Sequence, residues 1–273
     1  MLSLPGSLHS SIVDEMVLPG GVGNAGLVVR IGDTVRRPWH PSTEATHAVL
    51  TYLNEVLPGV APLPLGRDEQ GREVLSYLPG EVAVEPFPAW AAGLDYLVSI
   101  GRLLRRVHDA LANWRFPPGL AWSDELADPH GGELIVHADV CPENVITRDG
   151  RAEAIIDWEF AAPGRRIWDV VSTARLCVPF THPSRRDPVF TGADVAARLR
   201  AFLDAYQLED ADRGRFTEVL RERSLAGERF VRGRVARGEP AFVERWATPD
   251  GVSRLRVEQA WISAVPSDVA RRE

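Results

Sequence analysis

The chain has 273 residues, and its apolar fraction of 45% and charged fraction of 25% are typical of a globular protein that buries a large core. Its net charge of −7 at pH 7 disfavours nucleic acid and anionic membrane surfaces as partners, because both would be repelled. No stretch is apolar for long enough to span a bilayer, and the first residues lack the features of a signal peptide, so we expect a cytoplasmic protein.

The first predicted elements are short strands beside a glycine-rich segment. PGGVGNAG precedes a predicted strand over residues 26–31, which is followed by a turn and a second strand over 34–37. A glycine turn at a sheet edge can bring backbone N–H groups onto phosphates, here from Gly21, Gly23 and Asn24. A plain glycine-rich hairpin turn explains the segment equally well.

A helix and two further strands come next. Ser42 is the predicted N-cap of a helix whose apolar residues recur at helical spacing up to Leu57, and Pro58-Gly59 ends it. Strands are predicted at 62–65 and at 73–77, with a turn between them.

The second half of the chain is predicted to be mainly helical. A long helix ends near Leu111, and His108, beside its buried stripe, is interpreted as a structural histidine. The eight arginines between Arg213 and Arg237 alternate with acids at spacings that allow helix ion pairs, so we interpret them as a solvated helix face. Other helices are predicted at 167–176, 194–208, 212–238 and 240–265, with a break at 249–251 in the last.

The most informative stretch is HADVCPENVITRDGRAEAIIDWE, residues 137–159. A β-branched run ends before it, and two short strands joined by a turn at Asp149-Gly150 lie within it. Asp139, Asn144 and Asp157 therefore stand at strand ends around one hairpin, where we expect them to lie close together.

An Asp followed five residues later by an Asn matches the kinase catalytic-loop pattern H-x-D-x-x-x-x-N. In such a loop the Asp accepts the proton of the attacking hydroxyl, while the Asn and a second Asp supply hard oxygen ligands for Mg²⁺. Asp and Asn are also ordinary turn formers, so any one of them alone would carry little weight. The whole string, in its strand and hairpin context, favours phosphoryl transfer.

HADVCPENV together with IDWEFAAPGRRIWD resembles the catalytic segment of the aminoglycoside phosphotransferase and choline kinase-like family, written HGDLHPGNV…IDWE…WD. The resemblance implies that Asp139 is the catalytic base and that Asn144 and Asp157 bind the metal. It also implies that His137 and Asp169 support the loop.

This segment departs from the family pattern at several positions. Ala138 stands where Gly is usual, Val140 replaces Leu, Cys141 replaces the second His, and Glu143 replaces Gly. None of these changes removes a metal or proton group. Glu143 adds a carboxylate beside the site, and we include it as a candidate substrate-binding residue.

The resemblance also implies a nucleotide site in the first part of the chain. All 31 basic residues are arginines, so an arginine must replace the family's phosphate-anchoring lysine, and alignment of TVRRP favours Arg36. Its acidic partner could be Glu44, unless His47 faces inward instead. Ser76, Tyr77 and Leu78 resemble the linker between kinase lobes, whose backbone binds the purine; an ordinary strand end is the alternative.

The interpretation as a whole is an α+β, two-lobed protein-kinase-like fold, with a β-rich nucleotide-binding lobe over residues 1–79 and a helical catalytic and substrate-binding lobe over 80–273. The implied activity is transfer of the γ-phosphoryl group of ATP or GTP, with Mg²⁺, to a hydroxyl of a small acceptor. We expect a cationic acceptor such as an aminoglycoside, in a setting of antibiotic resistance. The acids that could attract it are Glu143, Asp204, Glu209, Asp210, Asp212 and Glu218.

Two alternatives stay open. The missing lysine and uncertain acidic partner allow a pseudokinase that binds nucleotide without turnover. The acceptor could instead be a choline-like alcohol, a sugar, a macrolide or a biosynthetic intermediate, because a fold specifies chemistry better than substrate. Cys141 and Cys177 are expected to be free thiols, since a disulfide would distort the loop.

Overall fold

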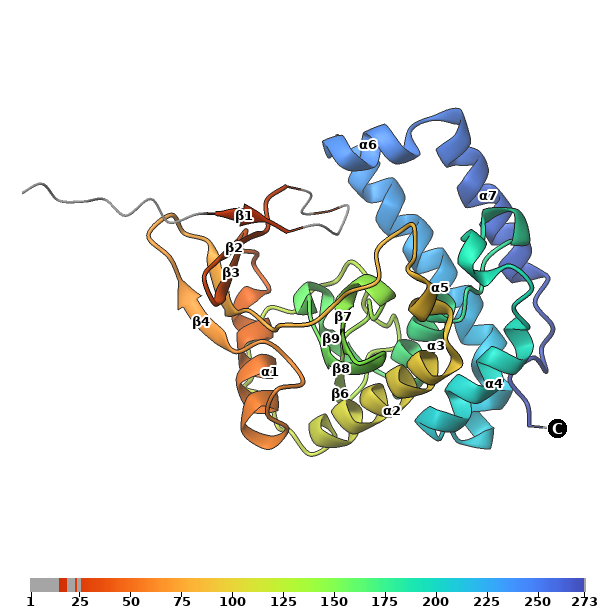
Figure 1. The fold of residues 1–273 in the computed structure, drawn as a ribbon, viewed down its shortest axis with the longest axis horizontal. Coiled ribbons are helices and arrows are strands. Elements are labelled where there is room, and N and C mark those ends of the chain that lie inside the picture. Colours follow the sequence, from red (N-terminus) through yellow and green to blue (C-terminus); the bar gives the residue numbers. More distant parts are fainter. Residues whose placement is uncertain (1–14, 19–22, 24–25, 273) are drawn as a thin grey trace, which may run out of the picture.

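The computed structural model describes residues 15–18, 23 and 26–272, and it confirms the predicted kinase-like α+β fold (Figure 1). An antiparallel sheet and one helix form the N-terminal part, and the rest is mainly helical. Gly21 and Asn24 lie outside the described residues, so their predicted contact with a nucleotide stays a prediction.

The N-terminal sheet has five strands in the described residues, in the order β1-β2-β3-β5-β4. The glycine turn at Gly32, with φ 58°, closes the hairpin between β2 and β3. Helix α1 packs beside the sheet, and its residues Val49, Leu50 and Leu53 are buried as the helical spacing predicted. The bounds are β1 Met16–Val17, β2 Val29–Ile31, β3 Thr34–Arg37, α1 Thr43–Val56, β4 Pro64–Arg67 and β5 Glu73–Ser76.

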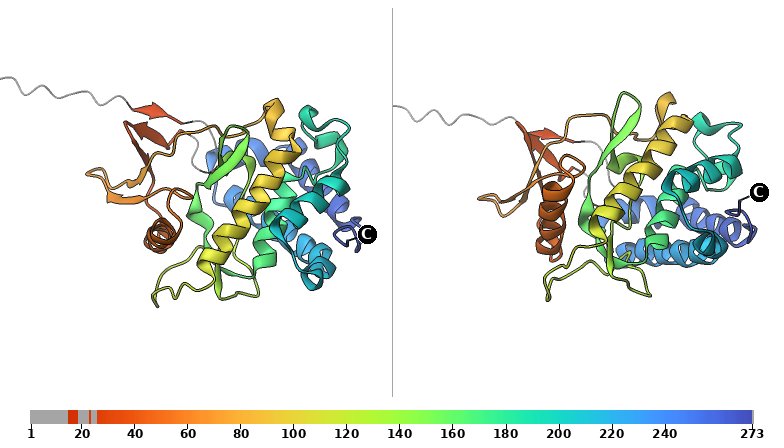
Figure 2. Two further views of the ribbon diagram at one scale, coloured as in Figure 1. Left: turned by 60° about the horizontal axis from the view of Figure 1, so that its bottom comes forward. Right: turned by 90° about the horizontal axis from the view of Figure 1, so that it is seen from below.

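Two small strand pairs lie between this sheet and the helices (Figures 1 and 2). β6, Leu134–Val136, pairs with β9, Ala162–Gly164, while β7, Val145–Arg148, forms a hairpin with β8, Arg151–Ile155. Asp149 and Gly150 make its turn with φ of 49° and 71°, as the Asp-Gly pair predicted. The hairpin is tied to the N-terminal part, because Ile155 N–H donates to Val60 O at 2.8 Å.

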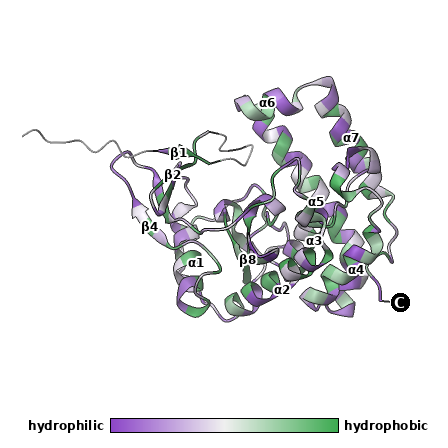
Figure 3. Cartoon of the chain, viewed as in Figure 1, coloured by the Kyte–Doolittle hydropathy of each residue, from purple (hydrophilic) through white to green (hydrophobic). Residues whose placement is uncertain are grey.

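Six helices make up the C-terminal part of the described chain. They are α2 Leu94–Leu111, α3 Arg166–Cys177, α4 Val195–Tyr206, α5 Asp210–Ala236, α6 Pro240–Trp246 and α7 Pro249–Ser263. α2 packs against α4, and α3 packs against α5, and all four helices contribute apolar residues to the buried core. Figure 3 shows hydrophobic and hydrophilic residues alternating along these helices. The short helix α6 lies beside the end of α5 and leads into α7 (Figure 1).

The structure differs from the sequence prediction at several elements. The strand β1 was not predicted, and β2 begins three residues later than predicted. β9 was not predicted, because Pro163 at its centre is rare in a strand; it is tolerated in this two-stranded pair. β4 begins two residues later than predicted. The predicted break at 249–251 lies just before these residues, which form the first turn of α7 with Pro249 at its start.

Both cysteines are free thiols in the structure. Among the described residues, none of the helices combines the length and the apolar character that a membrane span requires.

Candidate active site

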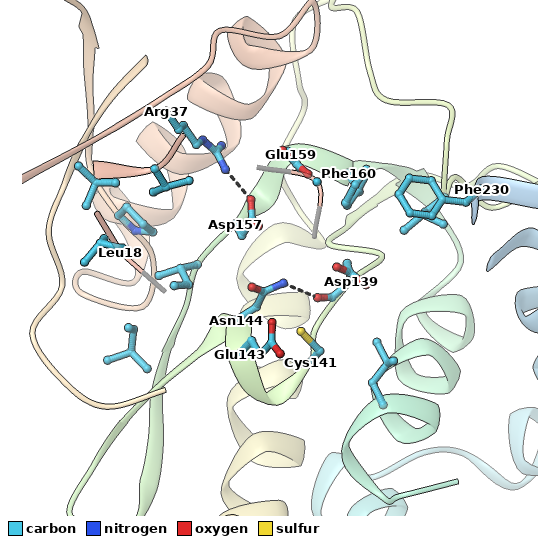
Figure 4. A pocket seen from close by; sticks show the side chains of 18 of the residues that line it. Leu18, Arg37, Asp139, Cys141, Glu143, Asn144, Asp157, Glu159, Phe160 and Phe230 are labelled. Carbon is cyan, nitrogen blue, oxygen red and sulfur yellow. Dashed lines mark hydrogen bonds and ion pairs between the residues drawn. The ribbon is translucent and has the colours of Figure 1, made fainter. Parts of the chain in front are cut away.

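A cleft of about 440 Å³ separates the sheet from the helices (Figure 4). Side chains from both parts of the chain line it. On the sheet side these include Val28, Val35, Arg37, Leu75, Ser76, Tyr77 and Leu78; on the other side they include Asp139, Glu143, Asn144, Ile146, Asp157, Arg175, Arg223, Phe230 and Phe242.

The floor of the cleft carries the three predicted chemical groups. Asp139 follows β6, Asn144 precedes β7, and Asp157 follows β8, so the strand ends bring them into one cleft as the sequence predicted. Asn144 Nδ2 donates to the backbone O of Asp139 at 3.0 Å. Asp157 adopts a left-handed φ of 62°, a conformation that Asp tolerates better than most residues.

The loop that carries Asp139 rests on Asp169, which lies on α3 and is fully buried. The backbone N–H of His137 donates to Asp169 Oδ2 at 2.8 Å, and that of Ala138 donates to Oδ1 at 2.9 Å. His137 Nε2 lies 2.9 Å from the backbone O of Ile156, so this side chain joins the loop to the strand that leads to Asp157. The geometry matches the predicted supporting roles of His137 and Asp169.

His108 completes this support, as expected for a structural histidine. Its Nε2 lies 3.1 Å from Asp169 Oδ2, and its Nδ1 lies 2.7 Å from the Tyr206 hydroxyl. Burial alone would raise the pKa of Asp169, but the hydrogen bond from His108 and the positive charge of His108 and His137 lower it. Asp169 therefore stays ionised and keeps accepting the loop's hydrogen bonds.

Ala138 holds a strained conformation in this loop. Its φ of 67° is left-handed, which is costly for a residue with a Cβ and accounts for the usual glycine here. Besides its N–H bond to Asp169, its carbonyl accepts hydrogen bonds from Ser172 Oγ at 2.9 Å and Arg223 Nη2 at 2.8 Å. These contacts fix the direction of the chain immediately before Asp139.

Asp139 is half-buried in the cleft. Burial raises the pKa of its carboxyl, and the charges of Arg223 and His137 oppose that rise. Within residues 15–18, 23 and 26–272, no group donates a hydrogen bond to its side chain. The carboxylate is therefore available to accept a proton from a hydroxyl placed in the cleft.

The arginine that reaches the cleft is Arg37. The prediction that Arg36 occupies this position was wrong. Successive strand residues point to opposite faces, and Arg36 turns toward Asp68, with Nε 3.5 Å from its carboxylate. Arg37 is 5% exposed and pairs with Glu73 and with Asp157, whose Oδ1 lies 2.5 Å from its Nη1. Burial would lower the pKa of Arg37, but these carboxylates raise it.

Glu73 is the acidic partner, and the predicted candidate Glu44 is exposed. Glu73 lies directly opposite Arg37 on β5, and His47 Nε2 lies 2.9 Å from its other oxygen. His47 thus faces inward, as the alternative prediction allowed. Burial alone would raise the pKa of Glu73, but the hydrogen bond from His47 and the charge of Arg37 lower it.

The predicted linker lines the sheet side of the cleft. Ser76, Tyr77 and Leu78 all face it, as does Gly23, and Arg148 Nε donates to the backbone O of Pro79 at 2.8 Å. Tyr77 N–H donates to Asp33 O at 2.8 Å. Among the described residues none accepts a hydrogen bond from the backbone N–H of Leu78, so this group is available to a ligand.

The donor set suits Mg²⁺ held together with a phosphate ligand. No group of three or more His, Cys, Asp or Glu in the described residues could hold a metal by itself. Mg²⁺ commonly keeps several waters and uses one or two protein oxygens plus substrate phosphates. Asn144 and Asp157 offer an amide oxygen and a carboxylate in the same cleft, which fits that requirement.

Comparison with characterised proteins identifies the family. The trifolitoxin immunity protein of Rhizobium leguminosarum bv. trifolii is 32% identical over 213 residues, which span 76% of this chain and 79% of that protein. The chain belongs to the phosphotransferase enzyme family. The model of that family matches residues 114–218, which include the loop, the hairpin and α3.

Solved structures of family-like kinases share the fold. An amicoumacin kinase in complex with AMP-PNP, Ca²⁺ and Ami has a TM-score of 0.63 at 15% identity, with 93% of this chain and 89% of that chain covered. The ethanolamine kinase of Plasmodium vivax has a TM-score of 0.64 at 11% identity, with 95% and 84% covered. An ADP-bound aminoglycoside phosphotransferase has a TM-score of 0.56 at 11% identity, with 93% and 95% covered.

The acidic residues that line the cleft differ from those that the sequence predicted. Of the acids proposed to attract a cation, Glu143 lines the cleft; the other five are absent from its lining: Asp204, Glu209, Asp210, Asp212 and Glu218. Asp204 instead pairs with Arg213 at 2.6 Å.

The interpretation of the arginines of α5 as a solvated face was wrong for Arg213 and Arg223, which are 1% and 3% exposed. Arg223, which lines the cleft, is one of the residues that sequence reasoning missed. A signal was present, because it lies on the apolar stripe of α5 between Leu220 and Phe230 at helical spacing.

Proposed function

We propose that the protein is a small-molecule kinase that transfers the γ-phosphoryl group of ATP or GTP to a hydroxyl, with Asp139 as the catalytic base. The observation that carries the proposal is the meeting of Asp139, Asn144 and Asp157 in one cleft with a carboxylate open to a hydroxyl. Burial raises the pKa of the Asp139 carboxyl, which makes its carboxylate a stronger base than an exposed one and suits proton acceptance.

The other groups would bind and orient the nucleotide. Arg37, fixed by Glu73, projects toward Asp157 and can bind phosphate oxygens in the place of a lysine. The N–H of Leu78 and the apolar side chains of Val28 and Ile146 would hold the base. Mg²⁺ bound by Asn144 and Asp157 would neutralise charge on the phosphates.

The biological setting that we propose is protection of a cell from an antibacterial compound. The relative from Rhizobium leguminosarum is named for immunity to trifolitoxin, and this chain covers 79% of it. Phosphorylation of a hydroxyl adds negative charge and bulk to a compound, which is a general way to abolish its binding to a target.

The test is a nucleotide-consumption screen with Mg²⁺ and either ATP or GTP, over aminoglycosides, macrolides, sugars, amino alcohols and hydroxy acids. Mass spectrometry should show an acceptor that gains one phosphoryl group. The matched control is Asp139→Asn, which should lower turnover by about 10²–10⁴-fold, the usual contribution of a positioned acid–base group, while nucleotide binding survives.

Full activity of Asp139→Asn would refute the role assigned to this residue. Mg²⁺-dependent nucleotide binding without a phosphorylated product across the panel would support the alternative of a nucleotide-binding pseudokinase. Arg37 lines the cleft and pairs with the buried Glu73, so the chain has a cation and an acidic partner, whose absence was the main reason for that alternative.

A further inference from the structure

The acceptor side of the cleft has an aromatic wall. The rings of Phe160 and Phe230 meet edge to face with centroids 5.4 Å apart, and those of Phe230 and Phe242 do so at 5.6 Å. Trp246 at the end of α6 also lines the cleft. Such a wall provides apolar contact area, and it suits the apolar or aromatic body of a ligand.

Two guanidinium groups flank one small space beside this wall. Arg175 on α3 and Arg223 on α5 both line the cleft. A Cβ added at Gly227 would lie 3.4 Å from Nη2 of Arg175 and 3.5 Å from Nη1 of Arg223. Both positively charged groups therefore border the space that this glycine leaves open.

The charge of this pair is only partly balanced by the protein. Arg223 donates to neutral oxygens, those of Ala138 and Ser172, and in the described part of the chain Arg175 makes neither an ion pair nor a hydrogen bond. Burial and the charge of Arg175 lower the pKa of Arg223 to about 10, while Asp139 and Asp169 oppose this effect. Asp139 interacts electrostatically with both arginines, but within the described residues neither forms an ion pair with a carboxylate, so both guanidinium groups can bind an anionic ligand.

A third arginine adds to the positive charge of this side. Arg245 lines the cleft, and its Nη2 lies 3.9 Å from the carboxylate of Glu85, a loose and exposed pair. A polycationic acceptor would meet repulsion from all three arginines. An anionic one would be attracted to them, and two guanidinium groups can each bind a carboxylate through paired hydrogen bonds.

We infer that the acceptor is an anionic small molecule, with an apolar or aromatic body packed on Phe160, Phe230 and Phe242 and a carboxylate or similar group between Arg175 and Arg223. The inference rests on the proposed function, because the acceptor hydroxyl must also reach Asp139. It replaces the cationic acceptor that the sequence suggested.

The experiment uses three probes: N-benzoyl-serine, its uncharged analogue N-benzoyl-serinamide, and kanamycin as a polycation. Binding to the full-length protein is measured by ligand-observed NMR without nucleotide, and phosphorylation is measured separately with Mg²⁺ and ATP or GTP. The carboxylate should bind at least about tenfold more tightly than the amide, which is the usual effect of a hydrogen bond to a charged group.

Three variants locate the effect. Arg175→Gln should abolish the preference for the carboxylate, whereas Arg229→Gln, an exposed arginine on α5 outside the cleft lining, should keep it. Gly227→Ala should weaken carboxylate binding by filling the space between the two guanidinium groups. Because Ala favours a helix more than Gly does, loss of folding would not explain that result.

The inference would be overturned if the wild-type protein bound the amide or kanamycin as tightly as it binds the carboxylate. It would also be overturned if Arg175→Gln lowered turnover of acid and amide equally while KM stayed unchanged, because Arg175 would then act on the transferred phosphoryl group. Failure of the proposed function is a different result: a carboxylate preference in binding, with no Asp139-dependent product from any acceptor.

Discussion

The two sides of the cleft are held in place by different kinds of interaction. On the floor, backbone N–H groups of His137 and Ala138 donate to the buried carboxylate of Asp169, so the main chain itself is fixed. On the sheet side, Arg37 is held by ion pairs between side chains, and one of them, to Asp157, reaches across the cleft.

The difference indicates which part can respond to a ligand. Backbone hydrogen bonds to a buried carboxylate keep Asp139 in one position whether or not the cleft is filled. The Arg37–Asp157 pair joins two groups that would both contact the phosphates and Mg²⁺ of a nucleotide, so we expect it to rearrange when a nucleotide binds. Four predictions test this contrast.

Removal of the Asp169 charge, which supports the floor of the cleft, should have the largest effect on stability. Asp169→Asn leaves an amide that cannot accept all three hydrogen bonds, from His137, Ala138 and His108, and should lower the free energy of unfolding by about 3 kcal/mol. Denaturant unfolding measures the change. The control is Asp149→Asn in the exposed turn, which should change stability by less than about 0.5 kcal/mol. Equal stability of both variants would show that Asp169 does not hold the loop.

Removal of the proposed metal ligand Asp157 should affect nucleotide binding rather than folding. Asp157→Ala should weaken Mg²⁺-dependent nucleotide binding by more than the roughly 10–100-fold that loss of an outer-shell partner costs. Titration calorimetry with and without Mg²⁺ measures the effect. Glu153→Ala, an exposed residue on β8, is the control and should bind nucleotide as the wild type does. Unchanged Mg²⁺ dependence in Asp157→Ala would exclude it as a ligand.

A matched pair of adjacent arginines tests the sheet side. Arg37→Gln should weaken nucleotide binding about tenfold through loss of a charged phosphate contact, whereas Arg36→Gln should stay within about twofold, because Arg36 pairs with Asp68 and is not part of the cleft lining. Arg37→Gln also leaves Glu73 buried without its ion pair, so folding could suffer. The double variant Arg37→Gln/Glu73→Gln removes both charges and should recover stability but not nucleotide binding. If Arg36→Gln has the larger effect on affinity, the placement of Arg37 is wrong.

The residues on the floor of the cleft could be predicted from the sequence, because local sequence patterns determine their positions. Strand ends, the Asp149-Gly150 turn and the spacing of Asp139 and Asn144 are all encoded within one short stretch, so hairpin geometry alone brings them together. The resemblance to the family added Asp169, which lies on the next helix. The limits of most helices were also predicted closely, because their apolar stripes are clear.

The sheet side was less predictable because it depends on contacts between distant segments. The choice between Arg36 and Arg37 depends on which face of β3 is covered, and a shift of one residue reverses it. Glu73 was missed because its partnership with Arg37 follows from strand register, which no local pattern revealed. Arg223 was missed because a buried arginine on an apolar stripe is rare, and the charge pattern of α5 favoured a solvated face.

The smallest predicted effect concerns the loss of stability that burial of the Asp139 carboxylate causes. Burial raises the pKa of Asp139 above its value in the unfolded chain, so the folded state binds the proton more tightly and is favoured at low pH. The cost is fully present above the raised pKa and disappears as pH falls below the unfolded value of about 3.9. Asp139→Asn, which is neutral at every pH, should therefore raise the melting temperature at pH 7 by roughly 1–3 °C.

The gain in melting temperature of Asp139→Asn should disappear as the pH is lowered, because the wild-type carboxyl then becomes neutral as well. Differential scanning calorimetry from pH 7 to pH 4 measures both trends. Glu143→Gln, which removes another carboxylate of the same loop, is the comparison. A melting temperature of Asp139→Asn below that of the wild type at pH 7 would mean that the ionised carboxylate is stabilised by its surroundings, and Asp139 would then be a structural acid rather than an available base.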